Sequence, residues 1–318
     1  KSVRARLIIL IIPLVLLSII LSVVAVTARA INIAREQSLD EMRRSAENAA
    51  NSLTYFHYSG QNLIATFAAD PALLDPDPQQ RTLALETARQ VVPFFQELLF
   101  VDQNLEITEA VPQEAKNLGL TPDEKLALER AQSAIRFSSV THLTKLPSGQ
   151  YGITLVEQVF RDEEDLTQPP EGFLLGRVQL DMNPEMRRSL EALQAAGGSS
   201  AGFILDENGF IIAHPDAKYV LRPWAVNEDA VQYAEHIGRG IAYEDIAAAG
   251  YRVLIYILSV EGTPYQVVLQ LPFTTVLETA TKISSPLLLV QISVGVLLLF
   301  AIPFFATRII QPLNTLAE

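Results

Sequence analysis

The stretch AGFILDENGFIIAHPD, residues 201–216, identifies the fold of the region around it. Two strand patterns, Ala201–Asp206 and Phe210–Ala213, flank Glu207-Asn208-Gly209. Asn-Gly favours the positive φ angles of a tight hairpin, so two antiparallel strands are predicted. A helical pattern and three further strand patterns follow, at Asn227–Ile237, Ile241–Asp245, Tyr251–Val260 and Tyr265–Leu271. Residues 197–285 are therefore predicted to form a small antiparallel sheet flanked by helices.

The same order of elements occurs upstream, in residues 79–196. Five strand patterns are found there, at Glu97–Asp102, Leu105–Val111, Ile135–Leu143, Tyr151–Phe160 and Phe173–Asp181. Thr121-Pro122-Asp123-Glu124 combines an N-cap, a proline at the first helical position and acidic first-turn residues, which predicts a helix ending near Ser133. Further helices are predicted at Gln79–Gln90 and Asn183–Ala195. Two like-ordered units predict an α+β fold of tandem modules.

A long helix is predicted before the first module, because residues 27–68 contain no Pro and no Gly before Gly60. Apolar and small residues recur along it at heptad spacing: Leu39, Met42, Ala46, Ala49, Leu53, Phe56, Gly60, Leu63 and Phe67. A helix of about 40 residues is ~60 Å long, more than one small domain covers. The stripe is therefore expected to pack along two stacked domains or against a second copy of the chain, and we expect a parallel homodimer.

Two charge-free apolar runs enclose all of these elements. They are LIILIIPLVLLSIILSVVAV, residues 7–26, and PLLLVQISVGVLLLFAIPFF, residues 286–305. Twenty helical residues span about 30 Å, the thickness of a bilayer core. Lys1, Arg4 and Arg6 precede the first run and Arg308 follows the second, so both ends are predicted to be cytoplasmic.

This topology predicts an integral protein of the cell (inner) membrane with two spans and residues 27–285 outside the cytoplasm. A cleaved signal peptide ending near Ala28-Arg29-Ala30 is the alternative, but signal cores are usually shorter, ~7–15 residues. The predicted divisions are a cytoplasmic N-terminus 1–6, a first span 7–26, a dimerisation helix 27–78, modules 79–196 and 197–285, a second span 286–306 and a linker 307–318.

Composition argues against several functions. The chain carries a formal net charge of −12, which disfavours nucleic acid as a partner. It has no cysteine, and its four histidines lack the spacing of metal-binding or catalytic motifs. We therefore expect no metal, no cofactor and no catalytic residue in this segment.

The arrangement of a long helix, two PAS-like modules and a helix into a second span resembles the double Cache (dCache) sensor domain of bacterial transmembrane receptors. Asp206, Gly209 and His214-Pro215 are similar to the Asp-x-x-Gly hairpin and His-Pro of the membrane-proximal module in that family. In the membrane-distal module Leu105 stands where the pattern favours Gly, so we expect a different turn there. Arg308–Glu318 resembles the start of a HAMP linker, with a helix restarting at Pro312-Leu313.

The resemblance implies a ligand surface on the distal sheet and on the helix and loops that cover it. The polar groups near the predicted strands are Arg136, Ser138, Thr141, Tyr151, Thr154, Glu157 and Asp181. A guanidinium such as that of Arg136 can hold a carboxylate through two parallel bonds, although a surface ion pair is the alternative. Asp181 resembles the position from which family members reach a ligand amine, or it caps the helix that follows. The aromatic cluster of the amino-acid-binding members is missing around Arg136.

The sequence thus predicts the input half of a transmembrane receptor, either a chemoreceptor or a sensor kinase. A small extracytoplasmic ligand would shift the helices, and the second span and HAMP linker would relay the shift to a cytoplasmic output module of the same chain. That module could be a histidine kinase, a nucleotide cyclase or a phosphatase. A membrane-anchored assembly or adhesion ectodomain without a small-molecule ligand is the alternative.

Overall fold

The computed structural model describes the backbone of residues 3–161, 168–180, 182–194, 201–224, 240–247 and 250–315, and side chains only between residues 10 and 304. The chain divides into two compact units. One comprises residues 1–42, 244–254 and 271–318, and the other residues 43–243 and 255–270.

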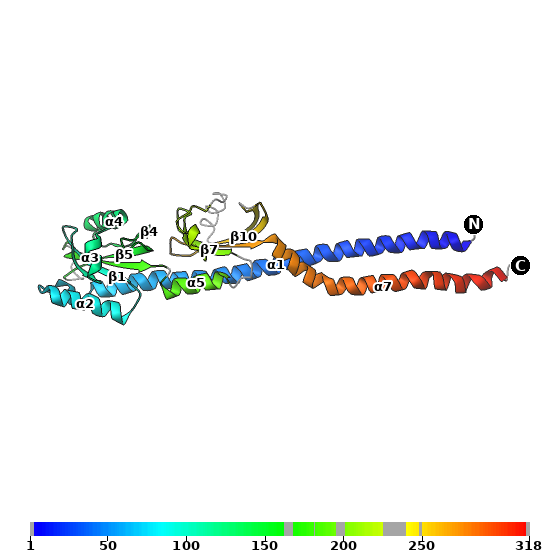
Figure 1. Ribbon diagram of the computed structural model, residues 1–318, viewed down its shortest axis with the longest axis horizontal. Coiled ribbons are helices and arrows are strands. Elements are labelled where there is room, and N and C mark those ends of the chain that lie inside the picture. The colour runs from blue at the N-terminus through cyan, green and yellow to red at the C-terminus, as the bar shows by residue number, and fades with distance from the viewer. Residues whose placement is uncertain are drawn as a thin grey trace. The chain divides into compact units, whose positions relative to one another are not determined.

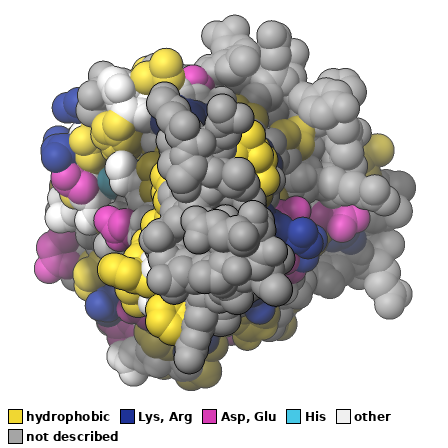
Figure 2. Space-filling view, turned by 90° about the vertical axis from the view of Figure 1, so that its right-hand side faces the viewer, with side chains coloured by type: hydrophobic (Ala, Val, Ile, Leu, Met, Phe, Trp, Pro, Cys, Tyr) yellow, Lys and Arg dark blue, Asp and Glu magenta, His cyan; other side chains and the backbone are white. Residues whose placement is uncertain are grey.

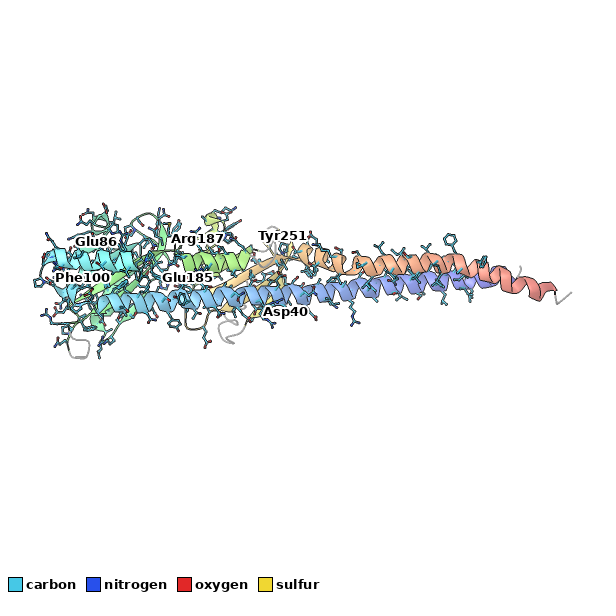
Figure 3. The ribbon with its side chains drawn as sticks, turned by 90° about the horizontal axis from the view of Figure 1, so that it is seen from below. Asp40, Glu86, Phe100, Glu185, Arg187 and Tyr251 are labelled. Carbon is cyan, nitrogen blue, oxygen red and sulfur yellow. The ribbon has the colours of Figure 1, made fainter. Side chains whose placement is uncertain are left out.

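Two long helices contain the apolar runs. Helix α1 is Val3–Ala68 and helix α7 is Phe273–Thr315. Their apolar parts lie side by side within the first unit (Figures 1 and 3), and Ile19 packs directly over Gly295. By length and composition both helices could cross a membrane. Helix α7 continues through Pro312, so the expectation of a new helix starting there is wrong; the lost backbone donor and the clash of the proline ring with the preceding turn can bend a helix without ending it.

The distal module is a sheet between helices. Its elements are η1 (Pro71–Leu74), α2 (Pro78–Val91), β1 (Glu97–Asp102), β2 (Ile107–Val111), α3 (Glu114–Leu118), α4 (Pro122–Ser133), β3 (Ser138–Val140), β4 (Thr144–Lys145), β5 (Tyr151–Val159), β6 (Gly172–Gln179) and α5 (Pro184–Gln194). The strand order is β2-β1-β6-β5-β3, and β4 also pairs with β5. Helix α4 covers one face, while α2 and the end of α1 lie on the other (Figure 1).

The proximal module repeats this sheet. It contains β7 (Ala201–Leu205), β8 (Ile211–Ala213), η2 (Ala217–Tyr219), β9 (Ile241–Ile246), β10 (Arg252–Ser259) and β11 (Gln266–Pro272). Its strand order, β8-β7-β11-β10-β9, matches that of the distal sheet position by position. The predicted α+β fold of two antiparallel modules on a long N-terminal helix is therefore confirmed. The helix predicted at 227–237 lies outside the described residues.

The two hairpin turns have the same hydrogen bonds. In the proximal turn the Asp206 carboxylate accepts from the backbone N–H groups of residues 208 and 210, and Gly209 has a φ of 78°. In the distal turn the Asp102 carboxylate accepts from residues 104 and 106, and Leu105 adopts a φ of 64°. The expectation of a different distal turn is wrong, because the aspartate bonds hold Leu105 in a conformation that glycine adopts more easily.

The middle of the heptad stripe of α1, from Met42 to Gly60, is buried inside the single chain. Met42, Ala46, Ala49 and Leu53 have no exposed surface, and Phe56 is also buried. The first of the two expected packings is therefore observed, along the modules. At Met42, Ala46, Ala49 and Leu53 the stripe therefore has no surface left to bury against a second copy, whereas Leu39, Leu63 and Phe67 remain partly exposed.

Candidate ligand-binding site

A buried arginine marks the α4 face of the distal sheet. Arg177 is the one charged residue of strand β6, GFLLGRVQ, and has no exposed surface. Its Nη1 donates to Glu97 Oε2 of β1 at 2.8 Å, and its Nη2 donates to the carbonyl oxygen of Gly119 at 2.6 Å. A buried charge of this kind is found only where partners compensate for the lost water.

The main partner of Arg177 is Glu124 in the first turn of α4. Arg177 Nε and Nη2 donate to the two oxygens of the Glu124 carboxylate, at 2.7 and 2.8 Å, in a bidentate pair. The Thr154 hydroxyl of β5 and the N–H of Thr121 each add a bond of 2.7 Å to the same carboxylate. Glu124 also completes the capping box of α4 with Thr121. One carboxylate thus joins α4 to two strands.

The electrostatics of this pair follow from burial and proximity. Burial alone raises the pKa of Glu124, but the hydrogen bonds and charge of Arg177, with the bonds from Thr121 and Thr154, lower that pKa overall. For Arg177 burial alone has the opposite direction and lowers the pKa, since it disfavours the charged form. The hydrogen bonds and charges of Glu124 and Glu97 outweigh this effect and raise the pKa of Arg177 above its usual value. Both groups are therefore charged at neutral pH.

The rest of α4 lies directly on the sheet. Gln158 of β5 donates to the carbonyl oxygens of Ala131 and Ala134 at the C-terminal end of the helix, at 2.8 and 2.9 Å. Between the two ends, buried apolar side chains of α4 and the sheet fill the interface, among them Leu99, Val101, Ala127, Leu128, Val156, Phe173 and Leu175. The α4 face is thus closed at both ends and packed in the middle.

Open hollows lie elsewhere on the distal module. One of about 430 Å³ is lined by Thr82, Glu109 and Lys116, among other residues of α2, β2 and α3. Another of about 420 Å³ is more apolar and lies between the end of α1 and α2, beside Phe67 and Leu85. Neither contains a residue that the sequence predicts for the site.

The predicted site residues are divided between the two faces of the sheet. Thr154 and Thr141 lie together, since the Thr141 hydroxyl accepts from the Thr154 N–H at 2.9 Å, and Thr154 contacts Glu124. Ser138 is opposite Glu157 in the β3–β5 ladder, on the alternate side of β5 from Thr154. Residues on opposite faces cannot contact one small ligand.

The remaining predicted residues lie at the exposed edges of the distal sheet or outside the residues that the structure describes. Tyr151 begins β5, is 39% exposed and follows the same alternation as Glu157. Arg136 is exposed, and its guanidinium lies 4.6 Å from the centre of the Phe160 ring. Asp181 lies outside the described residues. Of the predicted residues that the structure describes, only Thr141 and Thr154 therefore belong to the buried cluster.

Sequence reasoning did not identify Arg177 and Glu97 as site residues, and it used Glu124 only as a helix-start signal. One sequence signal was available for Arg177, because a single charged residue inside an apolar strand requires a buried partner. The identity of that partner depends on how α4 crosses the sheet, which a single sequence does not specify.

The proximal motif residues build the turn and the strand end. Asp206 and Gly209 form the hairpin turn described above. His214 follows β8, its Nδ1 accepts from the backbone N–H of Asp216 at 2.9 Å, and its ring packs 4.7 Å from that of Tyr219. Pro215 lies in the bend between β8 and η2. These contacts give the motif a structural role in the fold.

The described surface shows mixed charges. On the side that Figure 2 presents, acidic and basic side chains are interspersed among hydrophobic ones. Charges of both signs therefore occur together on this side (Figure 2), as on an ordinary solvated surface.

Comparison with known proteins gives matches in structure only. No family model matches the chain, and no curated protein matches its sequence. The extracellular domain of the putative histidine kinase rpHK1S-Z16 is similar in structure, with a TM-score of 0.59 and 14% identity over 77% of this chain and 98% of that one.

Two further solved structures are similar. The ligand-binding domain of the Pseudomonas aeruginosa amino acid chemoreceptor PctB, in complex with L-Gln, matches with a TM-score of 0.52 and 16% identity over 74% of this chain and 92% of that one. An extracellular ligand-binding receptor from Desulfohalobium retbaense matches with 0.51 and 16% over 74% of this chain, which spans 40% of the receptor's length. In its fold, this chain is therefore of the double Cache type found in ligand-binding domains of chemoreceptors and histidine kinases.

Proposed function

We propose that this chain is the input region of a transmembrane receptor that binds a small extracytoplasmic molecule. The observation that carries the proposal is the pairing of a double Cache fold with two helices able to cross a membrane, one at each end. The segment acts as a sensor and not as an enzyme, and any catalytic output belongs to a cytoplasmic module of the same chain.

Within this function the distal module takes the ligand and the proximal module transmits its effect. The buried polar cluster around Arg177 supports this division, since polar groups able to orient a ligand gather on the α4 face of the distal sheet. The proximal module supports transmission, because its last strand, β11, continues directly into α7. Movement of α7 then alters the packing of a HAMP linker that begins near Pro312 and Leu313.

The receptor works as a homodimer through an exposed face of α1. Because the buried stripe packs against the modules, the dimer face consists of exposed residues that lie between the stripe positions on α1. These residues include Asn51, Tyr55 and Asn62. Tyr55 is 62% exposed, and tyrosine is enriched at protein interfaces.

The test is thermal unfolding of the full chain in detergent with a panel of L-amino acids and small carboxylic acids. A compound that binds only the folded state raises its stability by RT ln(1 + [L]/Kd), so the transition should move with concentration and saturate. If no compound in the panel stabilises the chain, the adhesion or assembly ectodomain becomes the better description.

A further inference from the structure

The carboxylate of Glu124 occupies a complete anion-binding position on the distal sheet. Three of its four donors come from strands, namely Nε and Nη2 of Arg177 and the Thr154 hydroxyl, at 2.7 to 2.8 Å. The fork of Arg177 matches the geometry of any carboxylate, whatever molecule carries it. Glu124 itself belongs to α4, the element that covers this position.

We propose that Arg177 and Thr154 form the recognition site for a ligand carboxylate, and that Glu124 occupies this site as an internal competitor in the ligand-free chain. The inference rests on the proposed function and adds the chemical class of the ligand, a molecule with at least one carboxylate. Ligand entry requires the N-terminal end of α4 to leave the sheet, so binding and the movement of α4 are one event.

The charges of the cluster make such an exchange feasible. One guanidinium faces two carboxylates, from Glu124 and Glu97. Replacement of the Glu124 carboxylate by a ligand carboxylate leaves the buried charge unchanged, so no additional unpaired charge enters the module. The displaced Glu124 stays in the first turn of α4, where the helix dipole favours a negative group.

The two ends of α4 are held by different kinds of bond. At the N-terminal end the bond is an ion pair that a solute can replace, whereas at the C-terminal end Gln158 holds backbone carbonyls. A carboxylate therefore competes only at the N-terminal end. The helix would open there while its C-terminal end stays on the sheet.

The first experiment removes the competitor. Glu124→Ala leaves Arg177 unpaired beside a gap the size of the lost side chain, and acetate is the probe that fits it. Thermal unfolding of the full-length variant in detergent should shift upward with acetate in a saturable way, and more than for wild type. Sodium chloride at equal ionic strength should give no such shift, and neither should acetate with Glu129→Ala, which removes an exposed acid from the same helix. If Glu124→Ala is unfolded without acetate, the recovery of circular dichroism gives the same titration.

The second experiment keeps the space filled. The side chain in Glu124→Gln has nearly the shape of glutamate but no charge. It should therefore compete less strongly than Glu124 with a solute carboxylate for Arg177. Calorimetric titration with acetate should give a dissociation constant at least ten-fold lower for Glu124→Gln than for wild type. Equal dissociation constants, or an acetate shift of Glu124→Ala no larger than that of wild type, would overturn the proposal.

These outcomes separate this inference from the proposed function. If the panel yields a ligand that stabilises wild type and Glu124→Gln equally, and acetate does not rescue Glu124→Ala, only the role of Glu124 fails. If acetate rescues Glu124→Ala but no panel compound stabilises the wild-type chain, the carboxylate position stands and the sensory function fails.

Discussion

At the scale of single residues, the distal module depends on one buried ion pair between Arg177 and Glu124. Such a pair contributes little to the stability of the folded chain compared with two apolar residues in the same places, because the cost of removing both charges from water offsets their attraction. Removing only one partner is different, since it leaves the other charged and buried. Stability should therefore be sensitive to single changes here.

We predict that Glu124→Ala lowers the free energy of unfolding by about 3–5 kcal/mol, the range for an uncompensated buried charge. Urea denaturation of the full chain in detergent measures it. The matched control is Arg188→Ala, which breaks a pair with Glu185 in which the Arg188 side chain is 68% exposed. Exposed pairs contribute about 0–1 kcal/mol, so a loss for Glu124→Ala as small as that of the control would contradict a buried pair.

The pH dependence of stability should show two separate ranges. The pKa of Glu124 is lowered in the folded chain, so its contribution is complete above the unfolded value of about 4.3 and is lost as pH falls through the folded pKa. Burial lowers the pKa of His57, so stability also falls as pH drops below about 6.5, where the unfolded chain binds the proton more readily.

Substitution should assign these ranges to their groups. His57→Gln should flatten the dependence just below pH 6.5, although only in part, because the pKa of His214 is lowered by burial as well. Glu124→Gln should flatten only the acidic range. Unfolding midpoints measured from pH 3 to 8 test both assignments, and a His57→Gln profile parallel to wild type would refute the first.

At the scale of elements, α1 has two functionally distinct faces. Leu53 is completely buried, whereas Tyr55, two residues further along, is 62% exposed. Leu53→Ala should destabilise the chain by about 2–5 kcal/mol, as for other buried leucines, while Tyr55→Ala should have a small effect. Urea denaturation of both variants measures the difference. Similar losses would mean that the two positions are not on different faces.

The exposed face of α1 carries the prediction about dimerisation. Because the chain contains no cysteine, single cysteines can be introduced without background. Oxidation in membranes should crosslink variants at Asn51, Tyr55 and Asn62 and leave those at Ala49 and Leu53 unlinked. Crosslinking that is equal at all five positions would remove the dimer from the proposal.

The elements themselves could be predicted from sequence where local chemistry determines them. Helix α4 begins and ends where the Thr121 cap and Ser133 indicate, because a capping box is a local signal. The distal turn was mispredicted because the side chain of Asp102, more than the residue at position 105, determines its shape. Of the strand predicted at 135–143 only β3, Ser138–Val140, is formed, and the short strand β4 that follows it at Thr144–Lys145 was not predicted, because pairing with β5 sets the limits of both.

At the scale of the whole molecule, the order of the larger helices and strands could be predicted from the sequence, but the short elements α3 and β4 and the contents of the site could not. Repeated hairpins and apolar runs are local patterns, and they predicted two modules between two apolar helices. The α4 face combines residues far apart in the sequence, such as Glu97, Glu124 and Arg177, whose meeting depends on the strand order of the sheet. Among the described residues, site prediction from separate strands therefore recovered only Thr141 and Thr154, which lie beside the pair of Glu124 and Arg177.

Signal transfer should depend on the continuity of α7. The helix runs without interruption from Phe273 at the end of β11 through the second apolar run to Thr315, so a rotation imposed at one end is carried to the other.

One alanine inserted after Ser284 turns everything beyond it by about 100° and moves it by about 1.5 Å, whereas seven inserted residues make nearly two complete turns and almost restore the phase. In a complete receptor the single insertion should change basal output strongly and the seven-residue insertion much less. Ligand affinity should stay the same in both, since neither alters the distal module. Pro312→Ala should also change basal output without affecting affinity. Output that is unchanged by all three variants would exclude transmission through this helix.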